Sequence, residues 1–200
     1  MNEGLDMPNT ELLAWIAEGV HLFYEAIEES LSSGPEDDTY TVLYLLTRGV
    51  NINAYHKDHE TPLHLAVMSD NLKLVALLVK NHASLTHVNM HGETPLHNAC
   101  RGGSSRIVTC LINAGCDKDA KTYDGNTPLH NAVRFNRIEN IRILILSGAN
   151  PMIKNRRGEH PMNLRCSNET KMTFKNTLEE KNEMDHDRNV EGVNRSSLYD

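Results

Sequence analysis

Thr61-Pro62-Leu63-His64, Thr94-Pro95-Leu96-His97 and Thr127-Pro128-Leu129-His130 are three copies of one tetrapeptide, and each copy begins 33 residues after the previous one. A fixed period of about this length is the signature of a protein built from stacked repeats. Such repeats have little interior of their own, and their extended concave face is the surface that they offer to other molecules. The period therefore predicts the architecture and a binding role together.

Residues around the tetrapeptide predict two helices in each unit. A proline in the first helical turn loses no intrahelical hydrogen bond and already has a helical φ. A glycine at positions 92, 125 and 158 precedes the motif at a turn that needs positive φ, and His59 occupies this position in the earlier unit. The second helix has apolar residues at helical spacing, and we expect Ile143, in register with Leu77 and Cys110, to be buried between units.

Ala66, Ala99 and Ala132 follow the three copies, so each reads Thr-Pro-Leu-His-x-Ala. This pattern is typical of ankyrin repeats, and the chain resembles the ankyrin repeat family. The resemblance implies an all-α solenoid of about five helix-turn-helix units, of which the first and the last are atypical caps. It also implies that the repeated His64, His97 and His130 hydrogen-bond between neighbouring turns.

The repeats divide the chain into three parts. Residues 1–20 are predicted to be an acidic N-terminal capping helix segment, because apolar residues from Leu12 to Leu31 follow one helical face. Residues 181–200 are predicted to be a disordered tail, because few apolar residues occur there. Residues 21–180 are predicted to form the array, with units at about 21–54, 55–88, 89–121, 122–154 and 155–180.

Charge is distributed unevenly along the chain, whose net charge is −7. Residues 1–47 hold ten acids and no Lys or Arg, whereas residues 48–165 hold fifteen bases and nine acids. The basic middle favours a protein partner with an acidic surface. Nucleic acid is not the expected partner, because basic and aromatic residues are not interleaved as in its binders.

Composition also bears on location and chemistry. No apolar run approaches the length of a membrane span, and the N-terminus lacks the basic start of a secretory signal. Four cysteines without a Cys-x-x-Cys spacing fit a reducing compartment, so we expect the protein in the cytoplasm, the nucleus or both. We also expect it to be a monomer. The sequence has no glycine-rich phosphate loop, nucleophile elbow or His-Glu-x-x-His motif, so we expect no enzyme, no cofactor and no metal site. Cys116, predicted in a loop, is the one candidate for a reactive thiol.

In proteins that resemble this one, partner contacts come from residues flanking the turn glycine and from the end of the first helix of each unit. Carried onto this sequence, the resemblance implies the following partner-binding residues: Lys57, Asp58, Glu60, Met68, Met90, His91, Glu93, Arg101, Tyr123, Asp124, Asn126, Arg134, Phe135, Arg156, Arg157 and Glu159.

Three functions follow from these patterns. The leading prediction is an intracellular protein–protein interaction module that uses its concave face and turn tips. A more specific alternative is an inhibitor of an NF-kappa-B-type transcription factor, since residues 60–67 and 120–130 look like such inhibitors. The sequence lacks their Asp-Ser-Gly-x-x-Ser degron, as do truncated viral mimics of them. A third alternative is a ubiquitin-ligase substrate adaptor, although residues 166–200 resemble neither a SOCS box nor an F-box.

Overall fold

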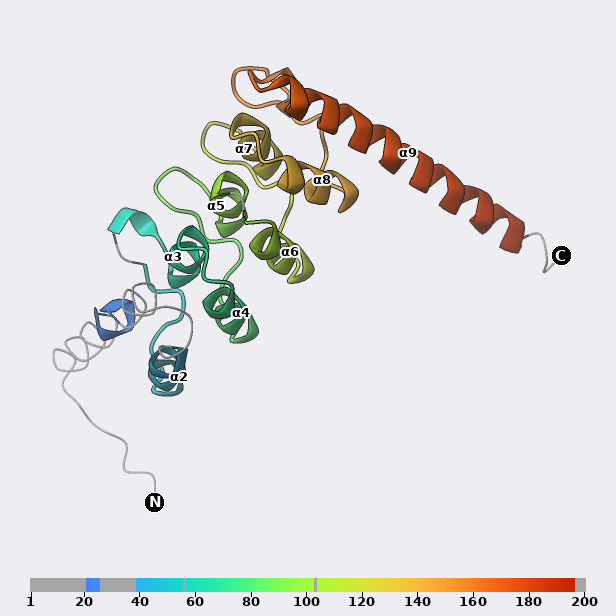
Figure 1. Ribbon diagram of the computed structural model, residues 1–200. Coiled ribbons are helices and arrows are strands. Elements are labelled where there is room, and N and C mark those ends of the chain that lie inside the picture. The colour runs from blue at the N-terminus through green and yellow to red at the C-terminus, as the bar shows by residue number, and fades with distance from the viewer. Residues whose placement is uncertain (1–20, 26–38, 56, 103, 197–200) are drawn as a thin grey trace. The chain divides into compact units, whose positions relative to one another are not determined.

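The computed structural model describes residues 21–25, 39–55, 57–102 and 104–196 (Figure 1). The chain divides into two compact units, residues 1–90 and 91–200. Every regular element in the described part is a helix, as the sequence predicted. In residues 1–90 these are a helical stretch at residues 21–25, α2 (Thr39–Thr47), the 3₁₀ turn η1 (Lys57–His59), α3 (Pro62–Met68) and α4 (Leu72–Lys80).

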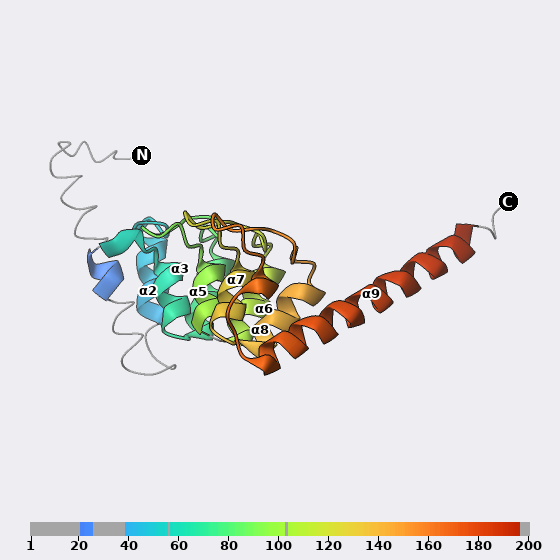
Figure 2. The same cartoon turned by 90° about the horizontal axis from the view of Figure 1, so that it is seen from above.

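Residues 91–200 contain two complete helix pairs and a terminal pair. The complete pairs are α5 (Pro95–Gly102) with α6 (Ser105–Asn113), and α7 (Pro128–Arg134) with α8 (Ile138–Leu146). The terminal pair is the 3₁₀ turn η2 (Pro161–Asn163) with α9 (Asn168–Ser196). Within this unit α5 packs against α7 and α6 against α8, as Figures 1 and 2 show.

Each first helix begins at the proline of the repeat. Pro62 and Pro128 stand at the start of α3 and α7, where a missing N–H costs no hydrogen bond. The next helix in residues 1–90 is capped by Asn71, whose side-chain oxygen accepts from the Leu74 N–H at 3.0 Å. These local signals explain why the helices are short and begin where the sequence predicted.

The apolar face of α4 contributes to the core of residues 1–90, and those of α6 and α8 to the core of residues 91–200. Their fully buried apolar residues recur at helical spacing: Leu74, Val75 and Leu78; Ile107, Val108 and Leu111; Ile141, Leu144 and Ile145. Ile143 is only half-buried, as are Leu77 and Cys110 at the same register. The expectation that Ile143 is buried between units was therefore wrong, because the inward face of α8 runs through its neighbours Ile141, Leu144 and Ile145.

The first repeat is described only in part. Residues 21–25 are helical, and Phe23 and Tyr24 are buried. The Tyr24 hydroxyl donates to the Ala54 carbonyl at 2.7 Å, which ties this helix to the loop that follows α2. The predicted acidic segment at residues 1–20 lies outside the described residues.

The last repeat differs from the others in both helices. Its first helix is reduced to η2, and α9 packs against α8, with Thr170, Phe174 and Thr177 buried. The structure departs from the predicted disorder of residues 181–200, because α9 continues to Ser196. Its packed first turns supply the costly helix nucleus, and residues 181–196 contain no proline, so each further residue adds a hydrogen bond. Residues 197–200 lie outside the description.

Candidate functional site

The loop tips before each first helix are joined by a repeated backbone hydrogen bond. Within residues 1–90 the Met90 N–H donates to the Asp58 carbonyl at 2.9 Å. Within residues 91–200 the Tyr123 N–H donates to the His91 carbonyl at 3.3 Å, and the Arg156 N–H to the Asp124 carbonyl at 2.9 Å. The same bond thus recurs at the sequence period and fixes the tips of consecutive repeats beside one another within each unit.

Two glycines make this close approach of the tips possible. Gly92 has φ 73°, and a Cβ atom there would lie 2.6 Å from the Tyr123 nitrogen. Gly125 has φ 78°, and its Cβ would lie 2.9 Å from the Arg156 nitrogen. Both conditions, positive φ and backbone contact, favour glycine, which explains its recurrence before the motif.

Two of the repeated histidines hydrogen-bond to the backbone of the next repeat's loop. The Thr94 N–H donates to His97 Nδ1 at 3.2 Å, and the Thr94 hydroxyl lies 2.9 Å from the same atom. Nδ1 is therefore an acceptor, and Nε2 carries the proton and donates to the Asn126 carbonyl at 3.0 Å. His130 makes the equivalent bond to the Glu159 carbonyl at 3.1 Å. For these two histidines the structure confirms the role implied by the resemblance.

Burial keeps these imidazoles neutral. Desolvation lowers the pKa of His97 below its usual 6.5, and the bond to the Asn126 carbonyl offsets only part of this effect. The pKa of His130 is lowered in the same way, and the nearby Arg134 charge lowers it further. A neutral imidazole with both nitrogens engaged is a structural group, with no lone pair left for a metal.

A hollow of about 250 Å³ opens between the loop tips and the helix ends of residues 91–200. We call it the tip–helix hollow. Seven of the sixteen residues predicted to bind a partner line it, together with two that were not predicted: His91, Glu93, Arg101, Asp124, Asn126, Arg134 and Phe135, with Thr122 and Asn131.

The helix side of the tip–helix hollow carries two arginines in repeat register. Arg101 at the end of α5 is held by Glu93, with 3.2 Å between Nη1 and Oε2. Arg134 at the end of α7 is exposed and makes no ion pair with another described residue. Phe135, which follows it, is 42% exposed. This wall therefore offers one oriented guanidinium, one unpaired guanidinium and an aromatic ring.

Four of the predicted contact residues share one register position and also bond within the array. Glu60 accepts from Asn89 Nδ2 at 3.2 Å, and Asn126 accepts from Asn155 Nδ2 at 3.1 Å. Glu93 is bound by Arg101 and by Asn131 Nδ2, and Glu159 by Asn155 Nδ2. The first three are buried and Glu159 is half-buried. Their side chains satisfy polar groups in adjacent loops, and their role in partner binding stays a prediction.

The other predicted residues lie apart from the tip–helix hollow. Asp58, Met68 and Met90 are exposed in residues 1–90, and the side chain of Lys57 is outside the description. Exposed residues of the second unit that do not line the hollow are Tyr123, Arg156 and Arg157. Of the two residues that were missed, Asn131 had a sequence signal, because Thr-Pro-Leu-His-Asn-Ala occurs identically at 94–99 and 127–132.

The cysteines do not support thiol chemistry. Cys116 is buried, and desolvation raises the pKa of its thiol to about 12. The prediction of Cys116 as the candidate reactive thiol was therefore wrong, since a reactive cysteine needs an accessible thiolate. Burial also raises the pKa of Cys100 and Cys110. Among the described residues, no three His, Cys, Asp or Glu side chains are grouped to hold a metal ion.

Comparisons with known proteins agree with the repeat geometry. A family model described as ankyrin repeat matches residues 58–90, and one described as ankyrin repeats in three copies matches residues 83–155. A search of curated proteins found no match to the chain. In the part of the chain that the structure describes, no helix is both long and apolar enough to cross a membrane.

Proposed function

We propose that this chain, whose residues 58–155 are ankyrin repeats, holds a partner protein in the tip–helix hollow. Ankyrin repeats suggest a protein–protein interaction module, and such modules recognise partners through loop tips and first helices. The observation that carries the proposal is that predicted contact residues from separate parts of the sequence lie together. Seven residues predicted from the family pattern, spread from position 91 to 135, line one hollow.

Arg134 and Phe135 are the anchors we assign. Arginine and aromatic residues dominate the energy of protein interfaces. Arg134 has no ion-pair partner among the described residues, and Phe135 exposes an aromatic ring beside it. Arg101 is already oriented by Glu93, so it loses less side-chain freedom when a partner binds.

The two arginines on the helix side of the hollow favour an acidic partner segment, although Glu93 and Asp124 also line the hollow. A carboxylate placed between the ends of α5 and α7 gains a charge-assisted hydrogen bond from Arg134. Arg156 and Arg157, exposed on the next tip, extend the positive surface. Association with such a partner slows as salt rises, because exposed charges are screened beyond about 8–10 Å.

The test compares two double variants, each of which replaces one arginine and one exposed apolar residue by alanine. Arg134→Ala with Phe135→Ala removes the anchors, whereas Arg106→Ala with Met152→Ala removes an arginine and an exposed apolar side chain that do not line the hollow. Proteins captured by the wild-type chain are identified by mass spectrometry, and the best-ranked one is purified for titration calorimetry. We expect the anchor variant to lose roughly 2 kcal/mol or more of binding energy and the control to match the wild type. Equal binding by both variants, with melting temperatures unchanged, would move the interface away from the hollow.

A second candidate is the inhibition of an NF-kappa-B-type transcription factor. It is favoured by the likeness of residues 60–67 and 120–130 to such inhibitors. Part of the second stretch, namely Thr122, Asp124 and Asn126, lines the tip–helix hollow. The direct test is binding of the chain to a purified Rel-type DNA-binding region, followed by a DNA-displacement assay. Failure to bind there, with capture of another partner through Arg134 and Phe135, would reject this candidate and leave the interaction module standing.

A further inference from the structure

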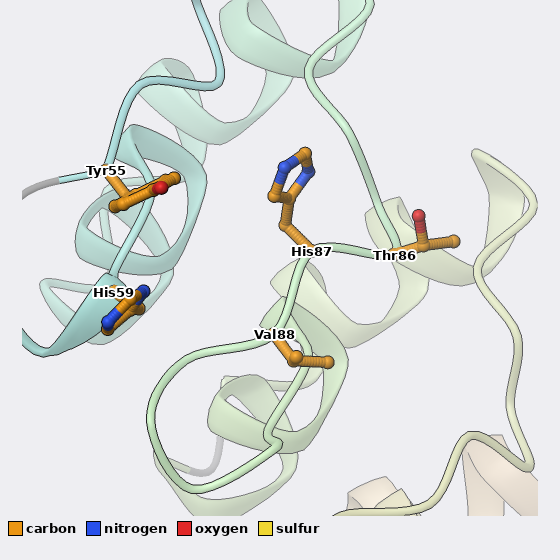
Figure 3. A pocket seen from close by; sticks show the side chains of 5 residues that line it. All are labelled: Tyr55, His59, Thr86, His87 and Val88. Carbon is orange, nitrogen blue, oxygen red and sulfur yellow. The ribbon is translucent and has the colours of Figure 1, made fainter.

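A second hollow lies in residues 1–90, apart from the residues used in the proposed function. It has a volume of about 380 Å³ and is lined by Tyr55, His59, Thr86, His87 and Val88. Figure 3 shows Tyr55 and His59 on one wall and the segment Thr86 to Val88 on the other. We call it the ring hollow, because three of its five side chains are aromatic or imidazole rings.

The rings of Tyr55 and His59 are stacked, with centroids 5.1 Å apart and planes inclined by 22°. Tyr55 is 58% exposed, so this stacked pair faces solvent. Val88 adds an exposed apolar side chain on the facing segment. None of the lining side chains is an acid, a lysine or an arginine. A charged group buried there would lose hydration without meeting an opposite charge.

His59 occupies a position where the repeat otherwise has glycine. It has φ 58°, and the equivalent Gly92, Gly125 and Gly158 have φ between 73° and 78°. At Gly92 and Gly125 a Cβ would approach the next tip to within 3.0 Å, as described above. His59 carries the backbone cost of its positive φ, as does the preceding Asp58 at φ 59°, and such costs concentrate at functional positions.

His82 shows that a positive φ value alone does not mark a binding position. It also has positive φ, 63°, where Gly115 and Gly148 stand in later repeats. A Cβ at those two glycines meets nothing within 4 Å, so a side chain there costs only the backbone conformation. His82 lies outside the ring hollow and provides a matched control for His59.

We propose that the ring hollow binds a proline-rich extended segment of a partner protein, with a proline ring against the Tyr55–His59 stack. The chemistry is complementary because the proline ring is apolar and flat, and the lining carries no acid, lysine or arginine. Proline-rich segments dock on aromatic-lined surfaces and are already ordered as polyproline II helices. A shallow hollow with exposed walls buries little area, so a ligand that has little entropy left to lose is favoured.

The probe is a blocked, uncharged hexaproline peptide added to the isotope-labelled full-length chain. Nuclear magnetic resonance follows the amides of Tyr55, Thr86, His87 and Val88. We expect saturable shifts confined to this surface and an affinity about tenfold weaker for Tyr55→Ala, as for an anchor residue. A blocked Gly-Ser peptide of the same length should cause none of these shifts.

Two glycine variants separate a binding role from a structural one. His59→Gly should raise the melting temperature, because it relieves the backbone cost, and should weaken hexaproline binding by about tenfold. His82→Gly should also raise the melting temperature and leave the affinity unchanged. The proposal is overturned by the absence of saturable shifts, by His59→Gly binding as tightly as the wild type, or by tighter binding of a matched phenylalanine-serine peptide. None of these results bears on the tip–helix hollow, whose test uses other residues.

Discussion

Replacing Asn140 by leucine should stabilise the protein. Asn140 is 1% exposed on α8, at the register where α4 has Leu74 and α6 has Ile107, both fully buried. Its Nδ2 is 3.5 Å from the Ala99 carbonyl, the outer limit of a hydrogen bond, and its Oδ1 has no partner among the residues that the structure describes. Helix α8 thus carries a poorly satisfied amide at the register position where α4 and α6 carry an apolar side chain.

The magnitude follows from three contributions. Removing a buried oxygen without a partner recovers about 1–3 kcal/mol, and losing the long bond to Ala99 costs about 0.5–1.5 kcal/mol. Burying a leucine in place of an amide adds about 1 kcal/mol or more, within the range for apolar side chains. The sum is a gain of about 2 kcal/mol, or a rise of about 4–8 °C in melting temperature for a chain of this size.

Urea denaturation followed by circular dichroism measures this change. Leu74→Asn is the reverse substitution at the same register and should lower stability by about 3 kcal/mol, because it buries an amide in an apolar environment. Asn140→Ala should be close to neutral or destabilising, because it leaves a cavity. A lower melting temperature for Asn140→Leu would refute the reasoning and show that the Asn140 amide stabilises the fold.

Four other predictions test the description of the fold. Leu144→Ala should cost about 2–5 kcal/mol and Ile143→Ala clearly less in the same urea assay, because only Leu144 is fully buried; equal losses would contradict the register. The pKa of His97 is lowered in the folded state, so the fold binds fewer protons than the unfolded chain, and its stability should fall as pH drops from 6.5 through the folded pKa. The His97→Gln variant should lose part of this pH dependence in urea titrations at several pH values. The Cys116 thiol should react with an aromatic disulfide reagent only after unfolding, and rapid labelling of the native chain would show that it is accessible. Deleting residues 181–200 should reduce the helical ellipticity but leave the melting temperature nearly unchanged, because the α9 side chains described as buried, Thr170, Phe174 and Thr177, lie before residue 181; a large drop would show that the end of α9 packs on the array.

The sequence alone predicted most of the local structure. Proline at a helix start and glycine at a positive-φ turn act within a few residues, so each repeat of Thr-Pro-Leu-His predicts one helix and the turn before it. The histidine network was implied by the family resemblance, and the structure confirms it for His97 and His130. The family pattern also identified seven of the nine residues that line the tip–helix hollow.

Other features depend on contacts between repeats that no single period contains. Glu93 and Asn126 follow a turn glycine like any exposed loop residue, and only the neighbouring Asn131 and Asn155 turn them into buried acceptors. Ile143 and Leu144 are adjacent and equally apolar, so the helical pattern alone did not separate the half-buried one from the buried one. Periodicity describes which residues share a helix face, whereas the packing of the next helix decides how deeply that face is covered. Only the tertiary structure therefore shows which core residues are fully buried and which residues line the two hollows. It also shows that α9 extends beyond its packed turns, because a formed helix lengthens at little cost.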